Sequence, residues 1–266
     1  MDSLENQLIT ETKVTPELLW KFGRIGEIKL SPDGKNIVFS LTRYSISANH
    51  GFTDLYSVNV AGGELKHLTT FAGSESNPRW KPNSTKIGFI ADEGDTSQIW
   101  EMNFDGTGKS KISDIEGGIN SFEYSPDGNK VLYCKDVKVR NTPQDIYPDL
   151  PKSEVYIANE LMYRHWNHWE DASVSHVFYS EIKDGKITNG KDIMEGEPYD
   201  SPLSPYFESE EISWTANSKG IAYTCKKMTP NEYSISTNSD IYLYNVETNK
   251  TENLTEGMPG YDKYPC

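Results

Sequence analysis

The chain has 266 residues, which is enough for one large all-β domain or two ordinary domains. Its 26 basic and 40 acidic residues give a formal charge of −14, and such an acidic surface argues against nucleic acid or an anionic membrane as partner. No apolar run reaches the roughly 18 residues of a membrane span, and Met1–Glu5 lacks the basic start of a signal peptide.

The first expected element is a short helix within an N-terminal segment, residues 1–25. Thr15 is a capping residue, Pro16 suits the first helical position, and Glu17 follows as an early acid. Leu18, Leu19 and Trp20 then provide apolar side chains before Gly23 ends the helix. We expect this helix to pack on the first sheet of the domain that follows.

A four-residue turn motif then recurs along the chain. Ser31-Pro32-Asp33-Gly34 returns as residues 125–128, and degraded copies start at Lys81 and Thr215, so successive copies are 50, 44 and 90 residues apart. Periods of about 40 to 50 residues built from short strands are typical of β-propeller blades. Proline presets the second position of a type I turn, and glycine takes the positive φ that closes it. Ser84 and Ser218 replace that glycine, which predicts looser or shifted turns there.

Alternating apolar residues flank each turn, and a third strand and a short polar edge strand follow. The pattern predicts an all-β fold, a partial β-propeller over residues 26–266 made of four-stranded antiparallel blades. Four blades are expected at 26–71, 74–115, 118–195 and 208–256. A fifth blade is expected to start where Tyr264-Pro265 matches Asn77-Pro78, so we expect the chain to be a piece of a longer protein.

Three other patterns resemble ligand sites but lack the required context. Residues 103–110 end like a phosphate-binding loop, but the first glycine is missing and no helix pattern follows. Asp92–Asp95 lacks the spacing of a calcium loop. The cysteines, Cys134, Cys225 and Cys266, have neither zinc spacing nor an even count, so free, half-buried thiols are predicted. No metal and no cofactor is expected.

The long third repeat holds an insertion, about residues 136–175, that we expect to be partly helical. The spacing of Val155, Ala158, Leu161 and Met162 indicates a helix face. Residues 163–171 then combine aromatic rings with charges, and Arg164, His165 and Trp169 are candidate substrate contacts. The alternative is that these rings only cover the third blade. His165 and His168 with Glu170 lack a convincing third metal ligand.

The stretches TPELLWKFGRIGEIKLSPDG and LMYRHWNHWEDASVSHVFYSEI, with the repeated turns between them, resemble a known family. The chain is similar to the N-terminal propeller of prolyl-oligopeptidase-family serine peptidases, in particular the bacterial dipeptidyl peptidase V and acylaminoacyl-peptidase-like branch. The resemblance covers about residues 14 to 266. It implies a propeller that filters short peptides and helps bind their N-terminus, above a C-terminal α/β-hydrolase domain with a Ser-Asp-His triad and no cofactor.

The catalytic half of such an enzyme is absent from this chain. No G-x-S-x-G nucleophile elbow occurs in the sequence, and none of the five histidines follows such a serine. We therefore expect no catalytic residue here and no hydrolysis by this chain alone. The resemblance also implies a periplasmic or exported protein.

An acidic run before the fourth blade is the second candidate substrate site. Because propeller carboxylates of dipeptidyl peptidases can bind the substrate α-amine, Glu208, Glu210 and Glu211 are candidates for that role. The alternative is a solvated loop on an acidic protein.

Two competing functions remain open. The chain could be a non-enzymatic propeller scaffold that binds protein partners, and the reading frame beyond Cys266 would separate this from a peptidase. A sialidase-type propeller is disfavoured, because its S-x-D-x-G-x-x-W spacing does not fit Ser31–Gly34. Four blades cannot close a ring of seven or eight, so the unstacked faces of the first and fourth blades are expected to pair two copies as a homodimer.

Overall fold

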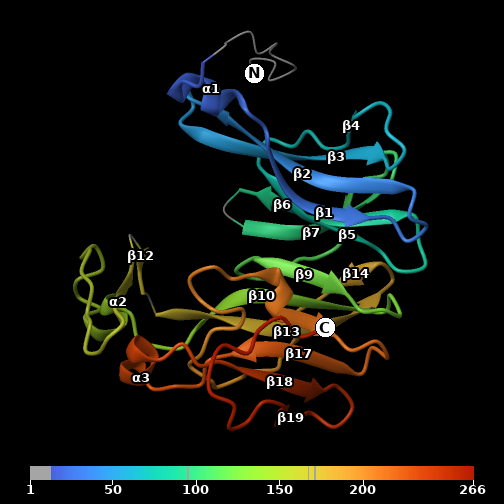
Figure 1. The fold of residues 1–266 in the computed structure, drawn as a ribbon. Coiled ribbons are helices and arrows are strands. Elements are labelled where there is room, and N and C mark those ends of the chain that lie inside the picture. The colour runs from blue at the N-terminus through green and yellow to red at the C-terminus, as the bar shows by residue number, and fades with distance from the viewer. Residues whose placement is uncertain (1–12, 95, 167, 171) are drawn as a thin grey trace. The chain divides into compact units, whose positions relative to one another are not determined.

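The structure, a computed structural model, describes residues 13–94, 96–166, 168–170 and 172–266. Met1–Glu5, together with Asp95, Asn167 and Asp171 of the stretches discussed above, lies outside the described residues. The chain divides into two compact units, Met1–Asp114 and Ile115–Cys266, which we describe separately. Figure 1 shows the strands of each unit as stacked sheets.

The first unit contains two four-stranded antiparallel sheets, as the repeat predicts. Helix α1 (Pro16–Lys21) precedes them, and the Leu18 N–H donates to the Thr15 side chain, which confirms the expected cap. The first sheet has the order β1 (Arg24–Leu30), β2 (Asn36–Ser45), β3 (His50–Asn59), β4 (Lys66–His67). The second has the order β5 (Glu75–Trp80), β6 (Lys86–Glu93), β7 (Thr96–Asn103), β8 (Ser110–Lys111).

Apolar side chains between these two sheets form the core of the first unit. Val38 and Leu55 of the first sheet pack with Ile87 and Phe89 of the second, and all four are wholly buried. On β1, by contrast, Ile28 and Leu30 are 59% and 58% exposed. They pair with Phe39 and Ile37 on the face that points away from the second sheet. That face is the unstacked side of the first blade.

The second unit repeats the architecture with a longer third blade. Its first sheet is built from β9 (Ser121–Tyr124), β10 (Lys130–Lys138) and β13 (Ser173–Lys183), and both β14 (Lys186–Ile187) and β15 (Lys191–Asp192) pair with β13. The next has the order β16 (Ile212–Trp214), β17 (Gly220–Cys225), β18 (Asp240–Asn245), β19 (Lys250–Asn253). The all-β propeller fold with four-stranded blades is therefore confirmed.

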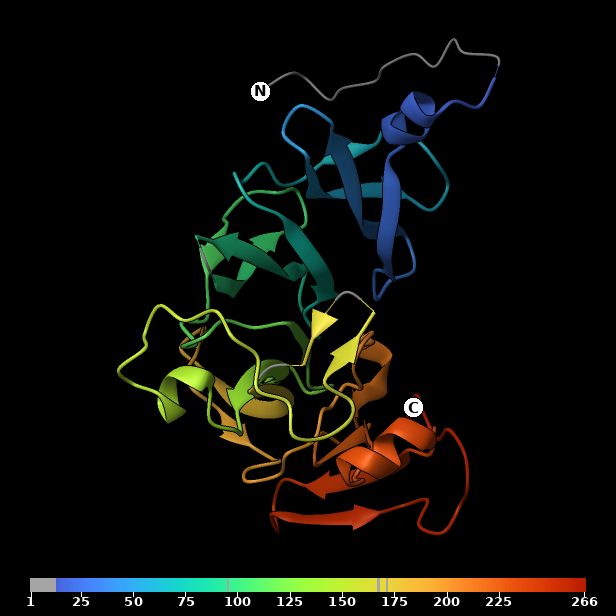
Figure 2. The same ribbon diagram turned by 90° about the vertical axis from the view of Figure 1, so that its left-hand side faces the viewer.

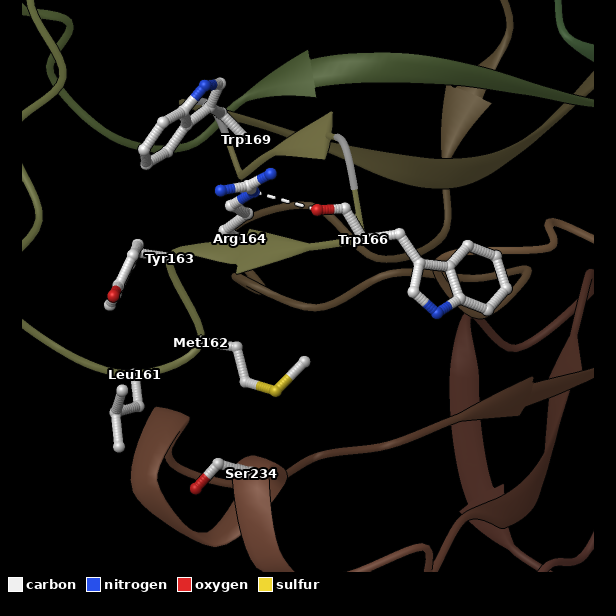
Figure 3. A pocket seen from close by; sticks show the side chains of 7 residues that line it. All are labelled: Leu161, Met162, Tyr163, Arg164, Trp166, Trp169 and Ser234. Atoms are coloured by element: carbon white, nitrogen blue, oxygen red, sulfur yellow. Dashed lines mark hydrogen bonds between the residues drawn. The ribbon is translucent and has the colours of Figure 1, made fainter.

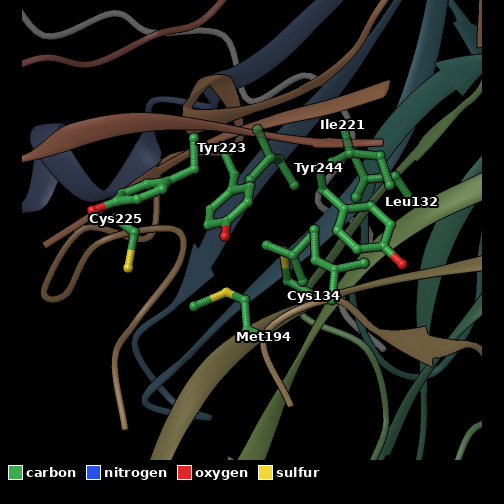
Figure 4. Close-up of a cluster of buried hydrophobic side chains, with 11 residues drawn as sticks. Leu132, Cys134, Met194, Ile221, Tyr223, Cys225 and Tyr244 are labelled. Atoms are coloured by element: carbon green, nitrogen blue, oxygen red, sulfur yellow. The ribbon is translucent and has the colours of Figure 1, made fainter. Parts of the chain in front are cut away.

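The core of the second unit lies between these two sheets (Figure 4). Leu132, Val177, Ile221 and Tyr223 are wholly buried there. Free thiols Cys134 and Cys225 lie in the same core, whereas Cys266 is exposed, so the expectation of half-buried thiols is wrong in detail. The two buried cysteines pack as small apolar side chains.

The turn motif keeps one geometry in three of its four copies. Gly34, Gly128 and Ser218 have φ of 70°, 73° and 58°, and each donates its N–H to the carbonyl oxygen of the residue three positions earlier. The expectation of a looser turn at Ser218 is therefore wrong. The Ser218 hydroxyl accepts the Asp127 N–H at 3.0 Å, and this bond offsets the cost of a left-handed serine. In the remaining copy the positive φ moves to Asn83 (56°), so the turn at Ser84 is shifted as predicted.

The insertion differs from the predicted helix. Helix α2 covers Pro143–Ile146, with Thr142 and Asp145 forming a capping box, but residues 155–162 are in neither helix nor strand. Val155 and Leu161 are about half exposed, so an apolar stripe there would gain little from burial, and β-branched residues such as Val155 and Ile157 weaken a helix of that length. Within the described residues no helix is long and apolar enough to cross a membrane.

The last residues of the chain keep the backbone of the matched repeat without its strand. Tyr264 has a φ of 59°, and its counterpart in the second blade, Asn77, has a φ of 53°. Asn77 lies at a bulge in β5, the inner strand of that blade. Residues 262–266 form no strand. Asn77-Pro78 and Tyr264-Pro265 therefore share a local conformation, as the alignment of the repeats predicts.

A buried histidine fastens the outer strand of the third blade. His176 Nδ1 is 2.8 Å from Asp192 Oδ2, and Nε2 is 2.9 Å from the Glu197 carbonyl oxygen, with the ring fully buried. Because a carbonyl oxygen only accepts, both ring nitrogens carry hydrogen when both bonds form. Burial alone would lower the pKa of His176, but the hydrogen bond and negative charge of Asp192 raise it above its ordinary value.

This pair predicts a pH-dependent contribution to stability. Because the folded pKa of His176 lies above the unfolded value of about 6.5, the contribution is full below that pH and is lost as the pH rises through the folded pKa. The His176→Gln variant should therefore lose about 3 kcal/mol of unfolding free energy at pH 6. The difference in unfolding free energy between this variant and the unsubstituted chain should become smaller towards pH 9. Urea denaturation at both pH values measures it, and a gap that stays constant or widens would contradict the assignment.

Candidate functional site

The part of the insertion richest in aromatic residues forms a two-stranded arm. β11 (Arg164–His165) and β12 (His168–Trp169) pair antiparallel, with Arg164 opposite Trp169. Trp166 begins the turn between them with a φ of 47°, which is uncommon for so large a side chain, and it is 64% exposed. The Arg164 Nε donates to the Trp166 carbonyl oxygen at 2.8 Å, which holds the turn in place.

The arm borders an open hollow of about 400 Å³, shown in Figure 3. Most of its lining comes from the arm and the residues just before it, and one residue comes from helix α3 (Pro230–Ile235). The lining residues are Leu161, Met162, Tyr163, Arg164, Trp166, Trp169 and Ser234. In the view of Figure 2 the arm and α3 face the reader from the same end of the second unit. The hollow is of a size that small ligands use.

Stacked rings stiffen one wall of this hollow. Tyr156 stacks on Trp169 with ring centroids 4.6 Å apart, and Tyr163 lies 6.2 Å from the same ring. The Arg164 guanidinium lies 5.5 Å from the centroid of Trp169, within cation–π range. His165 is half-buried and makes an edge contact with Trp166. Arg164 and Trp169 thus line the hollow, while His165 supports the tip of the arm.

Helix α3, the far wall, was not anticipated from the sequence. Thr229 and Glu232 form a capping box at its start. At its end the Lys226 ammonium donates to the carbonyl oxygens of Tyr233 and Ser236. The order Thr-Pro-x-Glu at 229–232 is the signal that could have revealed this helix.

The acidic run is held to the end of the chain by one lysine. The Lys263 Nζ lies 2.8 Å from Glu208 Oε2 and 2.6 Å from Glu211 Oε1. Tyr264 adds a 2.6 Å hydrogen bond to Glu208, and the Leu203 N–H donates to Glu211 at 2.5 Å. Glu210 stays exposed beside them. Of the three predicted carboxylates, Glu211 is buried and paired with Lys263, Glu208 is half-exposed and paired with the same lysine, and Glu210 is solvated.

The environment shifts these ionisation equilibria in opposite directions. Burial raises the pKa of Glu211, although Lys263 and the Leu203 N–H act against it. The hydrogen bond from Lys263 lowers the pKa of Glu208. Burial would lower the pKa of Lys263, but hydrogen bonds to the two carboxylates raise it. At neutral pH, Glu208 is therefore an anion, and it shares Lys263 with Glu211.

The Glu211–Lys263 pair has a counterpart in the first unit. Glu27 and Glu211 both stand four residues before the first turn residue of their repeats. Glu27 Oε2 is 2.6 Å from Arg79 Nη1 on the inner strand of the next blade. The shared position indicates that Glu211 ties one repeat to the next. A structural role therefore explains Glu211 better than the predicted contact with substrate.

One ring contact joins the two candidate sites. The Trp166 ring meets Tyr206 edge to face with centroids 5.6 Å apart, and Tyr206 lies two residues before Glu208. Both rings are more than 60% exposed. The arm and the acidic run are thus parts of one surface, which neither motif alone predicts. Among the described residues, no group of three or more His, Cys, Asp or Glu is arranged to hold a metal ion.

Comparison with known proteins agrees with this architecture. Residues 21–153 match the PD40 family, the TolB β-propeller domain. The chain belongs to this family. It is 43% identical over 256 residues to dipeptidyl-peptidase 5 of Porphyromonas gingivalis and 39% identical over 259 residues to the enzyme of that name from Porphyromonas endodontalis. These matches cover 96% and 97% of this chain but only 37% of each relative.

Solved structures show the same fold at lower identity. An acylaminoacyl peptidase from Pyrococcus horikoshii matches with a TM-score of 0.61 at 15% identity, over 90% of this chain and 33% of that one. The sequence resemblance to the propeller of dipeptidyl peptidase V and acylaminoacyl-peptidase-like enzymes is therefore confirmed. This PD40 propeller chain spans little more than a third of the relatives it matches.

The ion pair at Lys263 gives a direct test of which carboxylates are structural. Lys263→Met should cost about 3 kcal/mol of unfolding free energy near pH 7, because it leaves the buried Glu211 without its counter-charge. The loss should shrink towards pH 4 as Glu211 becomes protonated. Glu210→Gln, an exposed neighbour, is the matched control and should change stability by less than about 0.5 kcal/mol. Equal effects of the two substitutions in urea denaturation would show that Glu211 does not need Lys263.

Proposed function

We propose that this PD40 propeller is the substrate-selecting domain of a serine exopeptidase that releases dipeptides or acylated residues from short peptides. The observation that carries the proposal is the 43% identity to a dipeptidyl-peptidase 5 over 96% of the chain. In this proposal the rest of the protein provides a C-terminal α/β-hydrolase domain with the catalytic triad. The protein is then periplasmic or exported, as expected from the resemblance.

Within that enzyme, the surface made by the arm and the acidic run meets the peptide. Exposed rings at Trp166 and Tyr206 offer apolar contacts, and the half-exposed Glu208 and solvated Glu210 offer negative charge to the α-amine. Glu211 is left out of this role, because its carboxylate is buried against Lys263. Loop residues on a rigid sheet scaffold are a common location for binding sites.

The test uses the full-length protein and chromogenic dipeptide substrates with a free or an acetylated α-amine. Glu210→Gln and Glu208→Gln should each raise KM about tenfold for the free amine, because a charge-assisted hydrogen bond is lost. Neither should change KM for the acetylated substrate. If KM for the free amine is unchanged in both variants, the acidic run does not bind the α-amine.

The same assay tests whether residues 1–266 can hydrolyse peptides without the rest of the protein. Purified residues 1–266 should not hydrolyse either substrate, since the chain contains no nucleophile elbow. If the full-length protein also fails to hydrolyse them, the peptidase proposal is wrong and a non-enzymatic scaffold is favoured.

A further inference from the structure

The hollow at the arm holds a cation, Arg164, for which the described part of the chain provides no anionic partner. Arg164 forms no ion pair with any described residue, although the chain has 40 acidic residues. Its Nε is used by the Trp166 carbonyl oxygen, and the terminal nitrogens have no acceptor among the described residues. Figure 3 shows the guanidinium between Trp169 and the Trp166 carbonyl oxygen.

The guanidinium is also fixed in orientation. The Nε bond restrains one edge, and the Trp169 ring, itself stacked on Tyr156, lies against its face. An arginine held in this way presents two parallel N–H donors, which match the two oxygens of a carboxylate. Little side-chain entropy remains to be lost when such an anion binds.

The remaining walls suit an apolar group. Leu161, Met162 and Tyr163 line the hollow beside Arg164, and Ser234 of α3 adds a hydroxyl group. Apolar walls strengthen the attraction between Arg164 and an anion because they displace water. A ligand that fills the hollow therefore combines one carboxylate with a large apolar side chain.

We infer that this hollow binds the carboxyl-terminal residue of a short peptide, with the carboxylate on Arg164 and a large apolar side chain against Tyr163 and Trp169. A terminal residue carries both groups on one Cα, whereas an internal residue with an apolar side chain offers only a neutral backbone carbonyl. The inference rests on the proposed function, since it deepens the choice of short peptides as substrates. Together with an amine site at Glu208 and Glu210, the arm selects peptides by the distance between their two ends.

The test needs no turnover. Residues 1–266 are titrated with N-acetyl-phenylalanine and with N-acetyl-phenylalanine amide, which differ only in the terminal carboxylate, and tryptophan fluorescence reports binding next to Trp166 and Trp169. The acid should bind about tenfold more tightly than the amide, because only the acid forms the bidentate pair. Arg164→Gln should abolish this preference, and Arg164→Lys should keep part of it.

The matched control is Arg140→Gln, which removes one exposed arginine from the same insertion and should leave the preference unchanged. Equal affinity for acid and amide, no saturable binding of the acid, or an unchanged preference in folded Arg164→Gln would each overturn the inference. Because the readout is binding, a full-length protein without peptidase activity would count against the proposed function and not against this site.

Discussion

Stability in this fold depends on covering both faces of small antiparallel sheets. A four-stranded sheet cannot bury its own apolar side chains, so each must stack on a neighbour. In the first unit, Val38 and Leu55 do this against Ile87 and Phe89, and in the second Leu132 and Val177 do so with Ile221 and Tyr223. The middle strands are accordingly the most buried, and edge strands such as β4 are short and exposed. Binding features are therefore left to the segments that connect the strands.

The cationic side chains between repeats have different partners from the arginine at the arm. In a chain of net charge −14, two cations are matched to carboxylates of a neighbouring repeat, Arg79 to Glu27 and Lys263 to Glu211. In both pairs the glutamate stands four residues before the turn motif of its repeat. Breaking one would leave an uncompensated buried charge, which costs far more than the pair contributes. Arg164 and Lys226 donate to backbone carbonyl oxygens instead, but Lys226 is buried whereas Arg164 is exposed at the hollow.

The repeat could be predicted from the sequence because residues close together in the chain determine its turns and strands. Proline and glycine at Pro126 and Gly128 determine the hairpin, and the alternation around them determines the buried face. Ser218 was misjudged, because its left-handed backbone is supported by a hydrogen bond from Asp127, 91 residues away in the chain. The same limit applies to Val155–Met162, where periodicity predicts a helix but the stretch is in neither helix nor strand.

The sequence suggests which residues belong to the candidate site, but it does not show how they are arranged in space. Arg164 and Trp169 were identified from their aromatic and charged neighbours, and both line the hollow. The pairing of Glu211 with Lys263 spans 52 residues, and the contact of Trp166 with Tyr206 joins separate connections, so neither leaves a local signal. Sequence patterns therefore point to the candidate residues, and only the tertiary contacts show that Glu211 is paired with Lys263.

Amide hydrogen exchange followed by mass spectrometry is the most direct test of stacked blades. The stacking of sheets predicts the slowest exchange in the middle strands β6, β10 and β17, whose apolar residues are buried on both faces. Exchange should be fast in β4, in β8 and across residues 140–163. Protection of residues 140–163 equal to that of β17, or uniform protection across all strands of a sheet, would contradict this architecture.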